Sequence, residues 1–121
     1  MFGRCQKIAK NITIDVGHNP LAASVIKDVF IKNEKKISLI YNCFSDKDYT
    51  KVLTILKPII NDVLIINVED NRVVEKNNLL EVCSNLNIKV GDFQDISHKK
   101  EYLVFGSFSV VEEFLKVYGE K

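Results

Sequence analysis

Residues 11–20 read Asn-Ile-Thr-Ile-Asp-Val-Gly-His-Asn-Pro, and this segment determines how the remaining chain is arranged. The run 11–14 is typical of a buried strand, and residues 21–31 have the periodicity of a helix with Pro20 in its first turn. Asp15 is therefore expected at the carboxyl end of a strand. His18 and Asn19 are expected beside the free N–H groups of a helix start, where an anionic ligand is favoured.

The same succession of strand, polar turn and helix is repeated along the chain. Further strands are predicted at 37–41, 63–68, 88–90 and 102–105, and further helices at 49–56, 79–86 and 108–118. Residues 5–10 form either an edge strand or an irregular lead-in, and 91–101 fit no single element. The pattern predicts an α/β fold, with a mainly parallel sheet of about five or six strands and helices on both faces, of the Rossmann-like type.

The apolar residues of the predicted helices indicate which face of each meets the core. In the helix at 21–31 these are Ala22, Val25, Ile26, Val29 and Phe30. In the helix at 108–118 they are Phe108, Val111, Phe114, Leu115 and Tyr118. Both sets are expected to be buried.

Length and composition indicate one ordinary globular domain spanning residues 1–121. With 17 basic and 16 acidic residues, the chain has no overall field that would attract nucleic acid or an anionic membrane. Cys5, Cys43 and Cys83 lie far apart, without metal-ligand spacing, which favours a reducing cytoplasm. No apolar run approaches the length of a membrane span. The opening residues, with a strand only a few positions later, suggest a piece of a longer protein.

A parallel sheet would bring the polar turns together, because the carboxyl ends of its strands share one edge, where ligands bind. The turns in question are 15–19, 42–47, 67–72 and 106–107. We therefore expect the candidate site along that edge.

Several residues of these turns have both a functional and a structural interpretation. Asp15 and His18 could bind a ribose, a phosphate, a metal-bound water or a substrate carboxylate. In the structural interpretation, Asp15 caps the helix and His18 is an ordinary loop residue. Arg4 suits a phosphate, which a guanidinium binds in a bidentate manner. Ser107 suits either an N-cap or a contact to a carboxylate. Lys47 and Arg72 fit salt bridges and ligand contacts equally well.

Two further kinds of chemistry are disfavoured. Cys43 with His18 would be a nucleophile and base, but no local feature activates the thiol, so a small buried side chain is the better interpretation. The glycines form neither a dinucleotide-binding fingerprint nor a P-loop, so the chain has no glycine-rich loop that would by itself cradle a polyphosphate.

Taken in order, these motifs resemble the C-terminal domain of the bifunctional folylpolyglutamate synthase/dihydrofolate synthase, within the Mur ligase superfamily. They are Gly3-Arg4, the hexapeptide 15–20, Asp46-Lys47-Asp48, Arg72 and Gly106-Ser107. The likeness covers essentially the whole chain, and the hexapeptide is its most specific part. Family members usually have Gly-Ala where this chain has Val16-Gly17.

The resemblance implies an ATP- and Mg²⁺-dependent ligase that adds L-glutamate to dihydropteroate or folate through an acyl phosphate. In that family a larger N-terminal domain holds the P-loop and the magnesium ligands, and this chain lacks them. The C-terminal domain closes over the nucleotide, so the chain alone is expected to be inactive. Its partners would be its own N-terminal ATPase domain and the small molecules.

The resemblance also implies roles for individual residues. Arg4 would reach the ATP phosphates, Asp15 the ribose, and Asn19 would lie near the nucleotide. His18 and Ser107 would hold the incoming glutamate. Lys47 and Arg72 would be neighbours of the cleft, and no residue of this chain is assigned a bond-making or metal-binding role.

Two other interpretations stay open at this point. The chain could be a domain of another Mur-type amino-acid ligase, such as a cell-wall ligase. It could also be a stand-alone nucleotide-binding or interaction module, which would bind ATP without a companion domain.

Overall fold

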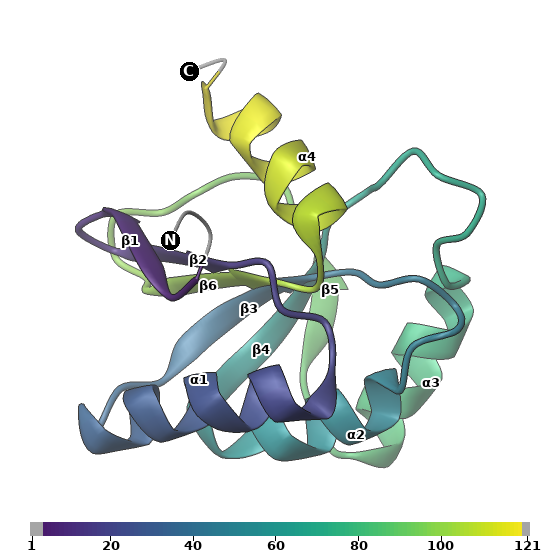
Figure 1. The fold of residues 1–121 in the computed structure, drawn as a ribbon, viewed down its shortest axis with the longest axis horizontal. Helices are drawn as coiled ribbons and strands as arrows, with labels where there is room; N and C mark the ends of the chain where they lie inside the picture. Colours follow the sequence, from purple (N-terminus) through teal and green to yellow (C-terminus); the bar gives the residue numbers. More distant parts are fainter. Residues whose placement is uncertain (1–3, 120–121) are drawn as a thin grey trace.

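The computed structural model describes residues 4–119, so Gly3 of the Gly3-Arg4 pair lies outside the described range. Within that range, strands and helices alternate along the chain (Figure 1). The strands are β1 (Gln6–Ala9), β2 (Ile12–Asp15), β3 (Ile37–Tyr41), β4 (Ile60–Ile65), β5 (Val90–Asp92) and β6 (Tyr102–Phe105). The helices are α1 (Pro20–Lys32), α2 (Tyr49–Leu56), the short 3-10 helix η1 (Lys57–Ile59), α3 (Lys76–Asn85) and α4 (Phe108–Gly119).

The six strands form one sheet in the order β1-β2-β6-β3-β4-β5. All neighbouring pairs are parallel except β1 and β2, which are antiparallel. The last strand, β6, lies between β2 and β3, with Val104 aligned to Ile14 on one side and to Ile40 on the other. The predicted fold class is confirmed, and the segment 5–10 contains the edge strand β1.

Helices cover both faces of the sheet, but unequally. Figure 1 shows α1, α2 and α3 together on one face and α4 alone on the other. The core has two corresponding clusters of buried side chains. Ile26, Leu39 and Leu53 belong to the cluster on the three-helix face, and Ile14 and Phe114 belong to the one beneath α4.

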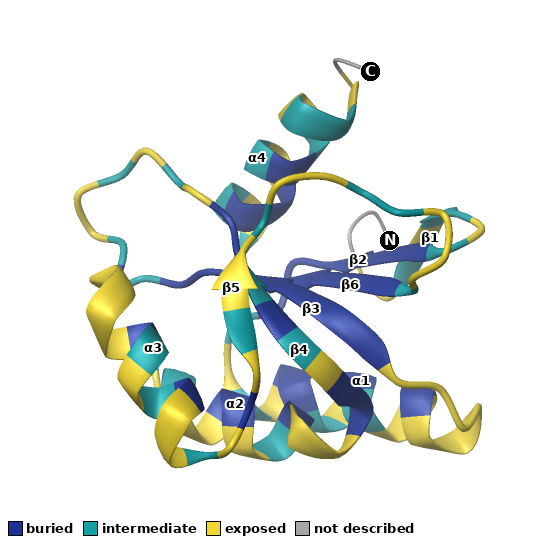
Figure 2. Ribbon diagram, turned by 180° about the vertical axis from the view of Figure 1, so that it is seen from behind, coloured by how far each residue is buried: buried dark blue, intermediate teal, exposed yellow. Residues whose placement is uncertain are grey.

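Burial is greatest in the middle of the sheet and decreases toward β5 (Figure 2). Every residue of β2, β3 and β6 is buried, whereas β5 is exposed or half-buried. Strands that are covered on both faces read as continuous apolar runs, which is why the central strands were predictable.

Several predicted details are wrong. Val25 and Val29 of α1 are 56% and 38% exposed, while Ala23 is fully buried in their place. Helix α1 is apolar on more than one side because of Leu21, Val25 and Ile31. The spacing of its apolar residues therefore did not determine which side of the helix faces the sheet. Phe108 was also expected in the core, but it is the first residue of α4 and is 66% exposed.

Strand boundaries differ as well. The strand predicted at 63–68 is β4, which begins at Ile60 directly after η1 and ends at Ile65. The strand predicted at 88–90 is β5, two residues later. Asp15, by contrast, is the last residue of β2, at the carboxyl end of a strand as predicted, and its side chain is buried. This burial affects the candidate site directly.

Candidate functional site

The ends of β2, β6 and β3 meet closely at the carboxyl edge of the sheet. The N–H of Gly106 donates to the carbonyl oxygen of Gly17 over 3.0 Å. Gly106 has φ +142°, and a Cβ atom on it would lie 2.2 Å from the carbonyl oxygen of Asn42. Only glycine fits there, because other residues avoid that backbone region and the neighbouring backbone leaves no space. The predicted convergence of the turns is therefore real for these three strands.

The buried side chain of Asp15 is hydrogen-bonded to the backbone of the turn that follows β2. Its Oδ1 accepts a hydrogen bond of 2.7 Å from the Gly17 N–H. Its Oδ2 accepts one of 3.1 Å from the N–H of Cys5, and Nη1 of Arg4 lies 3.9 Å from Oδ1. The carboxylate thus ties the Arg4-Cys5 segment to the turn. Because a carboxylate has about four acceptor positions, two backbone donors do not saturate it.

His18 and Asn19 lie where the turn meets α1. Asn19 is the N-cap of α1, and its Oδ1 accepts from the N–H of Ala22 over 2.8 Å. Pro20 follows at the first helical position. His18 is half-buried, and its Nδ1 is buried without a hydrogen-bond partner among residues 4–119. Buried polar atoms are normally paired, so this nitrogen is an exception among the described residues, although it exposes almost no surface of its own.

Arg4, His18 and Asn19 share a pocket of about 300 Å³, which Asp15 does not line. Arg4, His18 and Asn19 form its polar part. Leu21, Val25 and Phe108 form an apolar wall, and all three side chains are more than half exposed. The pocket therefore offers one cation, one imidazole and an apolar surface to the same ligand.

Ser107 stands beside this pocket, between Gly106 and Phe108. Its Oγ accepts a hydrogen bond of 3.3 Å from the N–H of Val110, so it caps α4. Both helices, α1 and α4, thus begin next to the pocket, and their first N–H groups favour an anion there.

Lys47 and Arg72 are at the same sheet edge but do not line this pocket. The guanidinium of Arg72 forms two hydrogen bonds to Asp70, of 3.1 and 2.8 Å, and lies 4.4 Å from the ring centre of Phe44. The hydrogen bonds from the Arg72 side chain and then from its backbone N–H lower the pKa of Asp70 to about 2. The backbone N–H of Lys47 donates to the carbonyl oxygen of Phe44, and its ammonium has no ion pair within the described residues.

Cys43 behaves as a structural residue. It is buried, and this burial raises the pKa of its thiol to about 11, so the thiol is neutral near pH 7. The neighbouring Asn42 was missed by the sequence analysis. Its Nδ2 donates to the carbonyl oxygen of Ile66 and its Oδ1 accepts from the N–H of Cys43, both over 2.8 Å. A polar residue after an apolar strand was the available signal, but it equally fits an ordinary turn.

No group of three or more His, Cys, Asp or Glu side chains among residues 4–119 is placed to hold a metal ion. No helix in this range is both long and apolar enough to cross a membrane.

No protein-family model matches the chain. The dihydrofolate synthase/folylpolyglutamate synthase of Buchnera aphidicola subsp. Schizaphis graminum is 30% identical over 130 residues, covering 97% of this chain and 31% of that protein. The crystal structure of Helicobacter pylori folylpolyglutamate synthetase is 43% identical with a TM-score of 0.96, covering 99% of this chain and 32% of that one.

More distant structures share the fold. E. coli FolC, in complex with DHPP and ADP, is 24% identical with a TM-score of 0.84 and coverages of 99% and 32%. A bifunctional folylpolyglutamate synthase/dihydrofolate synthase with Mn, AMPPNP and L-glutamate bound is 20% identical, with a TM-score of 0.80 and coverages of 98% and 32%.

The resemblance drawn from the sequence is thus confirmed: over almost its whole length, the chain is similar to part of a folylpolyglutamate synthase/dihydrofolate synthase. It spans about a third of the length of these relatives.

Proposed function

We propose that this chain is the C-terminal, glutamate- and nucleotide-contacting domain of an ATP-dependent ligase that adds L-glutamate to dihydropteroate or folate. The observation that carries the proposal is the pocket holding Arg4, His18 and Asn19, on a chain 43% identical to part of a folylpolyglutamate synthetase. A ligand with phosphates, hydroxyl groups and a carboxylate matches a pocket with a cation and two helix starts.

Arg4, Asp15 and Asn19 would contact the nucleotide. The guanidinium of Arg4 is 45% exposed and faces Asp15 at a distance too long for a hydrogen bond, so its donors are available to a phosphate. Asp15 would offer its remaining acceptor positions to a ribose hydroxyl and would hold Arg4 in place. Asn19 uses its oxygen to cap α1, and its amide N–H groups have no partner among the described residues.

His18 and Ser107 would hold the incoming glutamate. His18 lines the pocket, and the start of α4 at Ser107 supplies N–H groups for a carboxylate. Orientation is the contribution expected of this domain, since holding reactants in attack geometry lowers the barrier substantially. Lys47 and Arg72 would belong only to the outer rim of the cleft.

The remaining chemistry would come from a companion N-terminal domain with a P-loop. That domain would hold most of the ATP and the Mg²⁺, which assists activation of the substrate carboxylate as an acyl phosphate. The chain alone would then be inactive, and the whole ligase would work in the cytoplasm. ATP-dependent addition of glutamate by the 121-residue chain alone would refute this division of labour.

The test uses the complete open reading frame that contains this chain. Purified protein is assayed for glutamate addition to dihydropteroate, with ADP release and product mass as readouts. His18→Ala should raise the KM for glutamate roughly tenfold and Arg4→Gln the KM for ATP by a similar factor, because each removes a polar contact to one substrate.

Lys51→Gln is the matched control, because Lys51 is exposed on α2 and outside the pocket. The proposal is wrong if neither variant differs from this control. It is also wrong if the reading frame encodes no P-loop and the protein has no ligase activity.

A further inference from the structure

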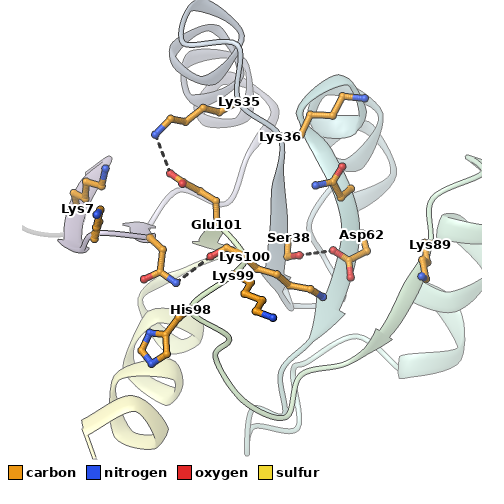
Figure 3. A pocket seen from close by; sticks show the side chains of 13 residues that line it. Lys7, Lys35, Lys36, Ser38, Asp62, Lys89, His98, Lys99, Lys100 and Glu101 are labelled. Atoms are coloured by element: carbon orange, nitrogen blue, oxygen red, sulfur yellow. Dashed lines mark hydrogen bonds and ion pairs between the residues drawn. The ribbon is translucent and has the colours of Figure 1, made fainter.

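A second and larger pocket lies at the opposite edge of the sheet, where the parallel strands begin. Its volume is about 880 Å³, and Figure 3 shows the side chains that line it. Asn11 just before β2, Ser38 in β3, Asp62 in β4 and Glu101 just before β6 contribute to its lining. None of the residues assigned to the candidate functional site takes part in it.

The pocket has a strong excess of positive charge. Its lining includes seven of the chain's seventeen basic side chains and only two of its sixteen acidic ones. The formal charge is therefore plus five here and minus four over the rest of the chain. The lysines are Lys7, Lys10, Lys35, Lys36, Lys89, Lys99 and Lys100.

Few of these charges are compensated within the protein. Lys35 forms an ion pair of 3.3 Å with Glu101, and it is the only one of the seven with an ion pair among residues 4–119. The other acidic residue, Asp62, accepts a hydrogen bond from Ser38 instead (Figure 3). Six ammonium groups around one hollow repel one another and together produce a positive local potential.

The loop that carries two of the lysines is fixed to the core. Nδ2 of Asn11 donates to the carbonyl oxygens of Ser97 and Lys100, over 3.1 and 2.9 Å. The N–H of Ser97 donates to the hydroxyl of Tyr102, whose side chain is buried. Lys99 and Lys100 are thus placed at the pocket by backbone contacts, and their side-chain charges take no part in holding the loop.

We propose that this pocket binds a small polyanion, a compact molecule with several carboxylate or phosphate groups. Its volume lies in the usual range of small-molecule pockets, roughly 300–1,000 Å³. Lysine provides point charges on flexible stems rather than the planar fork of arginine, so the site selects for total charge more than for one geometry. Binding relieves the mutual repulsion of the ammonium groups.

The distribution of charge favours a compact ligand over a long polymer. A nucleic acid needs positive charge along an extended face, and the chain outside this pocket is negative overall. The site is also independent of the proposed ligase function. Asp15 is four positions after Asn11, a distance of about 13 Å along β2, which exceeds the screening length of about 8 Å at physiological salt.

The experiment is calorimetric titration of the 121-residue chain with tripolyphosphate, with citrate, and with acetate as the monovalent control. Saturable binding of one or both polyanions is expected at about 10 mM ionic strength, with weaker binding at about 150 mM. Comparing tripolyphosphate with citrate distinguishes a phosphate site from a carboxylate site. No saturable binding of either, or binding of acetate with equal affinity, would overturn the proposal.

Two double variants test the location. Each double variant should weaken binding roughly tenfold, because each removes two charges near the ligand. The first combines Lys99→Gln with Lys100→Gln, and the second combines Lys36→Gln with Lys89→Gln. The control is Lys27→Gln with Lys51→Gln, which removes the same charge outside the pocket and should change affinity less than about twofold. An equal loss in the control would show unspecific attraction and refute the site. Far-UV circular dichroism checks that each variant is folded.

Discussion

The N–H of Gly106 and the carbonyl oxygen of Gly17 are joined by a hydrogen bond of 3.0 Å, just beyond the last aligned pair of β2 and β6. This contact joins the segments that follow β2 and β6 at the sheet edge where the candidate site lies. Because β6 is inserted between β2 and β3, the same glycine also lies against the backbone of Asn42. The geometry of the site thus depends on residues that carry no functional group.

Gly106→Ala should therefore destabilise the protein by about 3 kcal/mol, from an unfavourable backbone conformation and a clash with the Asn42 carbonyl. Urea denaturation measures the loss. Gly91→Ala is the control, because a Cβ atom there meets nothing within 4 Å. If both substitutions lower the stability equally, the close backbone contact at Gly106 is not the cause of the loss.

Asp15→Asn should cost roughly 1–3 kcal/mol of stability. An amide of the same shape has only one acceptor oxygen, so one of the N–H groups of Cys5 and Gly17 would lose its partner. Hydrogen exchange at the Gly17 amide should become faster. Asp28→Asn, at an exposed position of α1, removes the same charge and should have little effect. A stability loss in both variants would point to charge rather than to these hydrogen bonds.

The three cysteines should differ in reactivity toward a thiol reagent near about pH 8. Partial burial and then the charge of Asp15 raise the pKa of Cys5, but its side chain is exposed, whereas burial raises the pKa values of Cys43 and Cys83 to about 11. One thiol should react quickly and two only on unfolding, so Cys5→Ser should abolish the fast phase. A fast phase that survives this substitution would contradict the burial of Cys43 and Cys83.

The same two thiols make stability depend on alkaline pH. Their pKa values are higher in the folded chain than the ordinary value of 9.0, so their contribution is intact below pH 9 and is lost as the pH rises toward 11. Denaturation midpoints measured across this range should decrease. With Cys43→Ala the decrease should be smaller, and an unchanged decrease would exclude this thiol as a source.

Arg72→Gln should raise the pKa of Asp70 from about 2 toward the ordinary 3.8, because the hydrogen bonds of the Arg72 side chain are the main cause of the depression. In the unaltered chain, the pair contributes to stability above about pH 4 and loses this contribution as the pH falls through 2. Carboxyl NMR titration measures the shift. If Asp70 keeps its low pKa in the variant, the backbone N–H of Arg72 is the dominant donor.

The sequence predicted the fold and the polar residues of the pocket, but it placed Val25 and Phe108, which form the apolar wall, in the core. Continuous apolar runs such as 102–105 identify central strands, and parallel strands must end at one edge. His18 and Asn19 lie at that edge for this reason, whereas Arg4, which precedes the antiparallel strand β1, reaches the same pocket by another route. Their roles toward ATP and glutamate stay predictions, because they come from the family resemblance.

Other features depend on tertiary structure and left no decisive pattern. Helix α1 is apolar on several sides, so whether Ala23 or Val25 faces the core is decided by packing. Arg72 is paired with Asp70, two residues away, although the spacing fitted a ligand contact equally well. The lysines of the basic pocket come from segments as distant in the sequence as Lys7 and Lys100. No local sequence motif therefore predicts this pocket.

The basic pocket also gives the molecule a permanent dipole moment, with its positive pole at the amino ends of the parallel strands. A formal net charge of +1 conceals this asymmetry. Retention in chromatography depends on the charge that faces the matrix rather than on the sum. The chain would therefore be held by a cation-exchange resin even at its isoelectric point, near pH 7.7, where a protein with evenly mixed charges would pass through.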